Sequence, residues 1–274
     1  MKTSHLASIA GLGLLVLAAG PLAAGGIDPA APEAGPAPQP QVSFSPYLRA
    51  EVGSLLPELS DAYWLPPGQA DPRIDFDLDG DNAGFASAAF GIDWNNGLRT
   101  DLALIHTGDI GFSGPCASAS DGSDCDATPH ADITDGTVRS RAMMANLFYA
   151  PLEGRNPDAR IQPFVVGGLG VAWNTVESWT RFNPQAGTPP GSRPFRTFGS
   201  NTENDVAWSI GIGASWCLTD AETPIVMDVT WRYYDFGEAV GGDVADVGAS
   251  VPRQPLTFDL SSQVFSLGVR IPLQ

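Results

Sequence analysis

Apolar residues alternate with polar or small ones along eight segments of the chain. This period of two predicts β-strands whose two faces meet different surroundings. In the third segment, for example, Leu102 and Leu104 alternate with Asp101. The eight predicted strands are residues 46–56, 83–95, 98–108, 137–149, 161–174, 205–217, 224–236 and 263–272.

The connections between these segments alternate in length. Asn95, Asn96 and Gly97 form a tight hairpin signal between the second and third segments. About six to eleven residues join the fourth segment to the fifth and the sixth to the seventh, whereas the other connections are 57–82, 109–136, 175–204 and 237–262. A meander with tight turns at one end and long loops at the other is the plan of a transmembrane β-barrel. We therefore predict an all-β fold, an eight-stranded antiparallel up-and-down transmembrane β-barrel.

The composition of the two strand faces favours a membrane over water. A soluble sandwich is the alternative, with its apolar face inward and its polar face solvated. The polar face here carries Arg, Asp, Gly, Ala and Ser, whereas a solvated strand face would normally carry Lys, Glu and Thr. Aromatic residues gather near both ends of the predicted strands, as expected at two membrane interfaces. They are Tyr47, Trp94, Phe148, Tyr149 and Trp216 at one end and Trp173, Trp208, Tyr233 and Phe265 at the other.

The N-terminal region has the features of an export signal. Lys2 precedes an apolar run from Ile9 to Ala19, and small residues follow up to Ala24. We predict a signal peptide at 1–24, a Pro/Ala-rich periplasmic linker at 25–44 and an outer-membrane β-barrel at 45–274. The run is too short and too interrupted by Gly and Pro for a transmembrane helix.

The chain is strongly acidic, with a formal net charge of −17 and a pI near 4.2. Nucleic acid is excluded as a partner, because phosphate binding needs basic patches. Lys2 is the only lysine, so every basic residue beyond the predicted signal is an arginine, which suits forked carboxylate pairs.

Five segments are similar to the small outer-membrane β-barrel family that includes opacity-type and OmpA-like proteins of the porin-like superfamily. The most specific is Arg232 to Gly237, and the others are 145–149, 162–172, 208–215 and 265–270. The resemblance implies the outer membrane of a Gram-negative cell, contact with its lipids and lipopolysaccharide, and insertion by the barrel assembly machinery. Members of this family are structural, adhesive or porin-like. The chain departs from the family by ending in Gln274 rather than in an aromatic residue.

Charged residues on the predicted polar face are candidates for a network inside the barrel. An eight-stranded barrel is just wide enough to be filled by side chains, so these groups should pair with one another. A gated or narrow solute path through them is the alternative. The candidates are Arg49, Glu51, Asp93, Arg99, Asp101, Arg139, Arg141, Asp228, Arg232 and Arg270.

The second long loop contains two cysteines, Cys116 and Cys125, and an oxidising periplasm would let them form a disulfide. A zinc site is the alternative, but no further cysteine or paired histidines stand nearby to complete four ligands. Cys217 is left as a lone thiol.

The first long loop contains an Asp-x-Asp-x-Asp-Gly motif, at Asp75, Asp77 and Asp79, like the start of a calcium loop. The position of the usual bidentate Glu is Ala86, so the motif is incomplete. The motif indicates either a solvated acidic loop or a loose calcium or magnesium site, and no other cofactor is expected.

The chain shows no convincing active site. A barrel enzyme needs a His beside a Ser or Asp nucleophile system. His106 lies on the face opposite to Asp101, and His130 lies in a long loop. We therefore expect no enzyme but a structural or surface-interaction barrel with acidic extracellular loops and an unknown surface ligand. A small porin is the alternative, and a lipid-modifying enzyme that uses His106 or His130 comes third.

Overall fold

The computed structural model describes residues 44–125, 132–153, 155–156, 159–182, 196–219, 224–245 and 251–273. The predicted signal peptide and all but the last residue of the predicted linker lie outside the described residues. The described part contains strands, turns and loops and no helix, so none of its segments is a helix that could cross a membrane.

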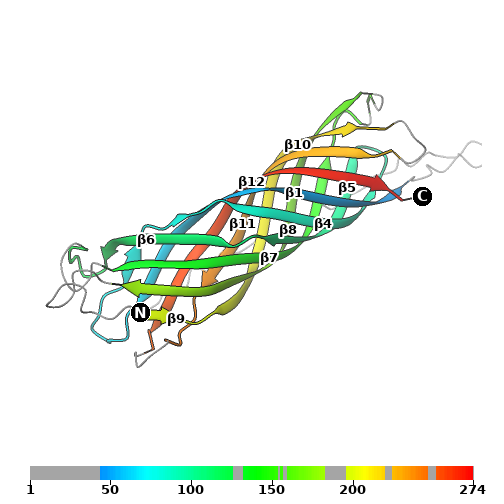
Figure 1. The fold of residues 1–274 in the computed structure, drawn as a ribbon. Coiled ribbons are helices and arrows are strands. Elements are labelled where there is room, and N and C mark those ends of the chain that lie inside the picture. The colour runs from blue at the N-terminus through cyan, green and yellow to red at the C-terminus, as the bar shows by residue number, and fades with distance from the viewer. Residues whose placement is uncertain are drawn as a thin grey trace, which may run out of the picture. The chain divides into compact units, whose positions relative to one another are not determined.

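Eight long strands form a closed antiparallel ring, drawn in Figure 1. Each pairs with the next long strand along the chain, and the last pairs with the first from Tyr47↔Pro272 to Ser60↔Asp259 before the register shifts. The predicted eight-stranded antiparallel barrel is thereby confirmed. The ring consists of β1 (Ser45–Leu65), β4 (Ala83–Asp93), β5 (Leu98–Thr107), β7 (Ile133–Tyr149), β8 (Ile161–Phe182), β10 (Asn201–Cys217), β11 (Val226–Val240) and β12 (Gln254–Pro272).

The two ends of the barrel differ. The short-turn end holds the hairpin at Asn95–Gly97, where both residues have positive φ values, 50° and 88°, that a tight turn requires. The long-loop end is extended by four further strands that the sequence analysis did not predict. These are β2 (Ile74–Phe76), β3 (Asp79–Gly80), β6 (Ile110–Ala119) and β9 (Arg196–Phe198). They continue the wall, because β2 pairs with β1, β6 with β7 and β9 with β8.

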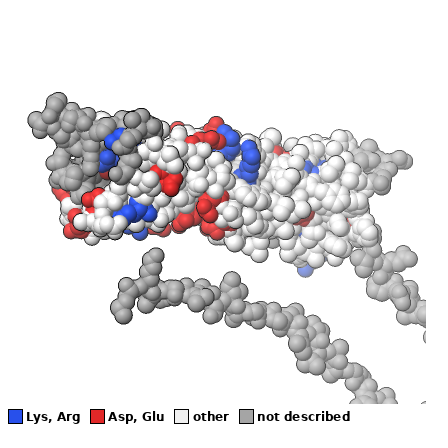
Figure 2. Space-filling view, turned by 90° about the horizontal axis from the view of Figure 1, so that it is seen from below, with Lys and Arg blue, Asp and Glu red and all other residues white. Residues whose placement is uncertain are grey.

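Near the short-turn end, apolar side chains point outward and polar ones inward. Leu102, Leu169 and Leu267 on the outside are 53%, 67% and 55% exposed, whereas Arg49 and Asp101 on the inside are 3% and 6% exposed. Such a broad apolar exterior is unfavourable in water but matches the hydrocarbon of a bilayer. On the face drawn in Figure 2, one half of the barrel is nearly free of charge while the other half carries many acidic groups. The alternative of a soluble sandwich is therefore wrong.

Toward the long-loop end, the same strands reverse the orientation of their apolar residues. On β12, Phe265 and Leu267 point outward, but Phe258 and Leu260 point inward. The inward residues of this half form one hydrophobic core that includes Trp64, Ile74, Phe112, Trp179, Phe198, Tyr234 and Phe236. This half is built like a soluble barrel, and its strands run further than predicted: β8 ends at residue 182 rather than 174, and β12 begins at 254 rather than 263.

Candidate functional site

The interior of the apolar half is filled by charged residues, and Asp101 on β5 is a centre of this network. Its side chain has no solvent exposure. One carboxylate oxygen accepts hydrogen bonds from Arg49 Nε at 2.9 Å and from the Tyr47 hydroxyl at 3.2 Å. The other accepts one from the Asn146 amide at 2.7 Å. The charge of Asp101 is thus met by three side chains from two other strands, β1 and β7.

A second carboxylate, Glu51, lies beside this group on β1. It pairs with Arg49, accepts a hydrogen bond from the Ser87 hydroxyl at 2.9 Å and lies 4.0 Å from Arg232. Arg232 donates to the Tyr234 hydroxyl at 3.2 Å and to the Asn146 carbonyl oxygen at 3.4 Å. The two carboxylates and two arginines therefore form one connected network across the lumen.

A second ion group lies closer to the short-turn end. Arg270 on β12 donates to Asp93 at 3.3 Å, and its Nε lies 3.7 Å from Asp228. The Ser215 hydroxyl donates to the other oxygen of Asp228 at 2.6 Å. Three strands besides β12 contribute to this group, so it ties the barrel wall together where the chain ends.

Arg99 joins the interior to the turn between β7 and β8. It lies 3.4 Å from Glu153, and burial raises the pKa of the Glu153 carboxyl despite the opposing effect of Arg99. Aromatic rings pack among the guanidinium groups. Phe148 lies 5.2 Å from Arg49, 5.5 Å from Arg99 and 5.1 Å from Arg232, all within cation–π range.

Two predicted members of the network, Arg139 and Arg141, lie on the outer face of the barrel wall. Both residues lie on the same outward-facing side of β7 as Met143. Their assignment to the interior was therefore wrong. Arg139 instead pairs with Asp109 at 2.5 Å and with Glu177 at 3.3 Å on the outer surface. The correction leaves four arginines (49, 99, 232 and 270) and four carboxylates (51, 93, 101 and 228) buried in the lumen.

Neutral residues of the network were missed by reasoning that looked for charge. Tyr47 and Phe148 were assigned to an aromatic girdle, but they are 1% and 2% exposed and point inward. Asn146 has the same inward parity as Phe148, and Ser87 lies opposite Glu51 on the neighbouring strand. Successive residues of a strand point to opposite faces, so the inward face includes every second residue. Counting the neutral residues as well as the charged ones on that face would have found them.

On the long-loop side of the ionic network, aromatic side chains fill the interior. Trp179 stacks on Phe198 with ring centroids 3.9 Å apart, and Trp64 meets Trp179 edge-on at 5.9 Å. The indole N–H of Trp179 donates to the carbonyl of Gly242 at 2.9 Å, which satisfies its polar atom. The interior thus consists of a polar layer in the apolar half and a mainly apolar layer in the charged half, where Trp64 also lies 5.3 Å from the buried Arg181 that pairs with Asp132 at 2.9 Å.

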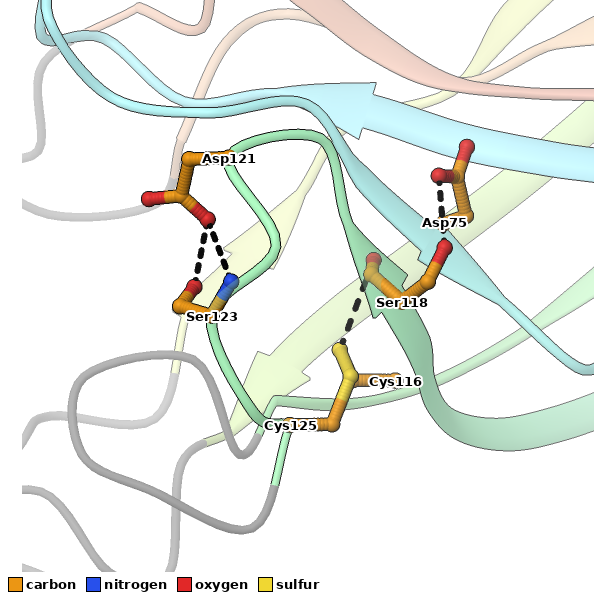
Figure 3. The surroundings of a disulfide bond; sticks show 6 residues. All are labelled: Asp75, Cys116, Ser118, Asp121, Ser123 and Cys125. Carbon is orange, nitrogen blue, oxygen red and sulfur yellow. Dashed lines mark hydrogen bonds between the residues drawn. A yellow bond between two sulfur atoms is a disulfide. The ribbon is translucent and has the colours of Figure 1, made fainter.

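The predicted disulfide between Cys116 and Cys125 is present, with the two Cα atoms 5.7 Å apart. Figure 3 shows its surroundings at the long-loop end, where Ser118 donates to Asp75 at 3.0 Å. Cys217 is a free, exposed cysteine near the short-turn end.

The three aspartates of the calcium-like motif do not converge. Asp75, Asp77 and Asp79 alternate along an extended segment whose residues 74, 76 and 78 are buried, which spaces the aspartates by roughly 6.6 Å. A calcium ion needs its oxygens within about 2.3–2.6 Å of one point. Asp75 is also engaged by Arg73 at 2.6 Å and by Ser118.

No group of three or more His, Cys, Asp or Glu within the described residues could hold a metal ion. The motif residues therefore do not form an EF-hand-like loop. A cation at these aspartates stays a prediction. It is tested by the effect of millimolar calcium on the melting temperatures of the wild type and of the variant with all three aspartates replaced by Asn.

The histidines show no catalytic arrangement in the part of the chain that is described. His106 is exposed on the outer face of β5, whereas Asp101 points into the lumen. His130 lies outside the described residues. The side chain of Ser140 is buried on the inner face of the barrel, whereas His106 lies on the outer face.

A closed ring of strands, a lipid-like exterior over one half and a polar interior define the class: this chain is a β-barrel protein of the outer-membrane type. No family model and no curated protein matches its sequence. Several solved structures have similar chain traces at low sequence identity, and three of them are described next.

The first is Neisserial surface protein A, with 14% identity over 84% of this chain and 99% of that chain and a TM-score of 0.45. The second is the outer membrane protein OprG from Pseudomonas aeruginosa, with 12% identity over 82% and 95% of the chains and a TM-score of 0.45. The third is the outer membrane protein AlkL, with 14% identity over 89% and 97% and a TM-score of 0.42.

Proposed function

We propose that this protein is a non-conducting outer-membrane barrel that holds an acidic, rigid extension above the cell surface, in a structural or surface-interaction role. In this proposal the N-terminal and short-turn end faces the periplasm and the long-loop end faces the exterior, as in other barrels of this plan. The observation that carries it is the closure of the interior by two successive layers.

The ionic layer is a poor path for solutes because its charges are already paired. Arg49, Asp101, Glu51 and Arg232 are each at most 6% exposed. An entering ion would have to displace contacts that compensate buried charge, and such charge is costly to leave unpaired.

The aromatic layer adds a second barrier on the same axis. Trp64, Trp179 and Phe198 are 3%, 0% and 3% exposed and pack against one another. Phe112 and Phe258 meet edge-on at 5.1 Å in the same core. A hydrated ion would have to lose its water to cross this region. Apolar side chains offer no polar contacts to replace that water, so the free-energy cost of dehydration is not compensated.

The exterior of the long-loop half supports the second part of the proposal. Its strands extend beyond the apolar band and present carboxylates outward, which suits a basic partner at the cell surface. In Figure 2 acidic groups are spread over this half of the barrel. Exposed or half-exposed members are Glu58, Asp61, Asp75, Asp77, Asp79, Asp81, Asp109, Asp135, Glu177, Glu203, Asp205, Asp235, Glu238 and Asp259.

Planar-bilayer recording of the purified, refolded full chain tests the closed interior. We expect no steady conductance, with a water-filled porin recorded in the same bilayers as the positive control. Steady single-channel steps would overturn the proposal and establish the small-porin alternative. Binding of a cationic protein to intact cells, lost when the extension is removed by protease, tests the surface role.

A further inference from the structure

Arg141 lies on the outer surface of β7, at the border between the apolar and the charged halves. In the outward row of this strand it stands next to Met143, which is 40% exposed and at which the continuous apolar run that starts at Tyr149 ends. The side chain of Arg141 is exposed and makes no hydrogen bond or ion pair with a described residue. An unpaired arginine at the edge of a hydrocarbon band is placed to meet a lipid headgroup.

The residues beside Arg141 complete a binding surface for an anion. His106 on β5 and Trp173 on β8 are its direct cross-strand partners, and both point outward. Side chains paired in this way have Cβ atoms about 4.5–5.5 Å apart, so Arg141 and His106 can contact one group together. The exposed Trp173 is of the type that lies at membrane interfaces.

The nearby carboxylates do not compete for Arg141. Asp109 and Glu177 are both paired with Arg139, which lies two residues from Arg141 on β7, toward the long-loop end. Both carboxylates are therefore engaged by Arg139 and not by Arg141, so the Arg141–His106 pair can contact an anion from the surroundings.

An apolar groove of about 1100 Å³ lies on the same outer face, over β4, β5, β7, β8 and β10. It is hollowed because Ala145 and Gly167 are small while Leu102, Leu147 and Leu169 beside them are large. Its other outward lining residues include Phe90, Val165, Trp208 and Ile210.

The groove begins at the depth that an acyl chain would reach from Arg141. Ala145 is four residues from Arg141 on the same strand, which is about 13 Å along the strand. With a strand tilt of about 40°, this corresponds to roughly 10 Å of membrane depth. One leaflet contributes about 15 Å of hydrocarbon, so a lipid anchored at Arg141 would reach the groove with the ends of its chains.

We propose that Arg141 and His106 bind the phosphate of a lipid in the bilayer leaflet on the long-loop side, and that the groove holds an acyl chain of the same lipid. The lipid phosphate is complementary in charge to Arg141, and the acyl chain is complementary in shape to the apolar groove. The proposal is independent of the closed interior, because a conducting barrel would present the same outer face.

Native mass spectrometry of the full chain in detergent, titrated with dioleoyl phosphatidic acid, measures this binding. We expect saturable binding of one lipid, with much weaker binding of dioleoyl phosphatidylcholine. Arg141→Gln should raise the Kd for phosphatidic acid about fivefold, the factor expected for one arginine at an anionic interface. Arg155→Gln, an exposed arginine at the short-turn end, is the matched control and should leave the Kd unchanged.

A second pair of variants tests the groove. A Cβ at Gly167 would have its nearest neighbour at 3.9 Å, and one at Gly84 would have none within 4 Å, so both positions have room for a side chain. Gly167→Leu fills the groove and should weaken lipid binding, whereas Gly84→Leu, outside the groove, should not. Heat-modifiability of each variant on a gel verifies that the barrel is folded.

Three results would overturn the proposal. The first is an unchanged Kd in both Arg141→Gln and Gly167→Leu. The second is weaker binding in Arg155→Gln and not in Arg141→Gln, which would place the headgroup at the short-turn end. The third is displacement of the lipid by inorganic phosphate at similar concentration, which would show an anion site without a contribution from the chain.

Discussion

Replacing Asp101 with Ala is the sharpest test of the ionic layer. The carboxylate of Asp101 is fully buried and is met by Arg49, Tyr47 and Asn146. Removing one partner of a buried ion pair costs about 3–5 kcal/mol. Each further buried donor left without an acceptor costs about 1–3 kcal/mol. Arg49 keeps Glu51 as a partner, so we expect Asp101→Ala to lower the free energy of unfolding by about 3–5 kcal/mol rather than by the full sum.

Asp109→Ala is the matched control. Asp109 also pairs with an arginine, Arg139, through a hydrogen bond of 2.7 Å, but its side chain is 58% exposed. Water and salt screen such a pair, so its removal should leave the unfolding free energy unchanged within error. Both variants remove the carboxylate partner of an arginine, but only the Asp101 carboxylate is buried and also accepts hydrogen bonds from Tyr47 and Asn146.

Urea titration of the protein folded in lipid bilayers, followed by tryptophan fluorescence, measures both variants. The midpoint should fall for Asp101→Ala and stay in place for Asp109→Ala. Equal stability of the two would show that the lumen is hydrated and that water replaces the lost contacts. The closed-barrel proposal would then fail together with this prediction.

Three further outcomes are expected. Alkylation of unreduced protein should modify Cys217 alone, because Cys116 and Cys125 form a disulfide; three alkylated cysteines would contradict the pairing. Burial, together with neighbouring carboxylates, raises the pKa of Glu238 and of Asp259, which face each other across β11 and β12. The folded state therefore binds more protons than the unfolded state, and stability should rise as the pH falls from 7 through the raised pKa values. The double change to Gln and Asn should remove that part of the pH dependence. On a gel, unheated protein should migrate differently from boiled protein, and identical migration would argue against a folded barrel.

The eight strands could be predicted from the sequence because a bilayer enforces a simple rule. Every backbone polar group in lipid must be paired, so the chain forms a closed sheet with strict alternation over each membrane-spanning segment. The pattern of Leu102 and Leu104 against Asp101 follows this rule and located β5 within one residue at its C-terminal end. The alternation of short and long connections supplied the order of the strands.

The strand extensions could not be predicted with the same rule, because it ceases to hold at the membrane surface. Beyond the bilayer, water surrounds the wall, and the apolar residues must turn inward to be buried. Leu56 on β1 still points outward, while Leu55 and Leu59 are buried in the core. A search for one continuous phase of alternation stops at this reversal and assigns the remainder to loops.

The assignment of Arg139 and Arg141 to the lumen was wrong for a related reason. Both strand faces carry polar residues near the membrane border, so charge alone does not identify the inward face. The neighbouring Met143 and Leu147, whose outward positions share the parity of the arginines, would have decided it. Parity must be fixed from the apolar residues of a strand before its charged residues are placed.

The reversal of phase also gives the depth of membrane that the barrel spans. On β1 the outward apolar run from Leu48 to Leu56 covers about 26 Å along the strand, or about 20 Å of depth at a tilt of about 40°. On β8 the run from Ile161 to Trp173 covers about 40 Å, or about 30 Å of depth. The mean of about 25 Å equals the height expected for the apolar band of an outer-membrane barrel. The border therefore falls where Arg141 and Trp173 stand, and the charged half beyond it projects into water.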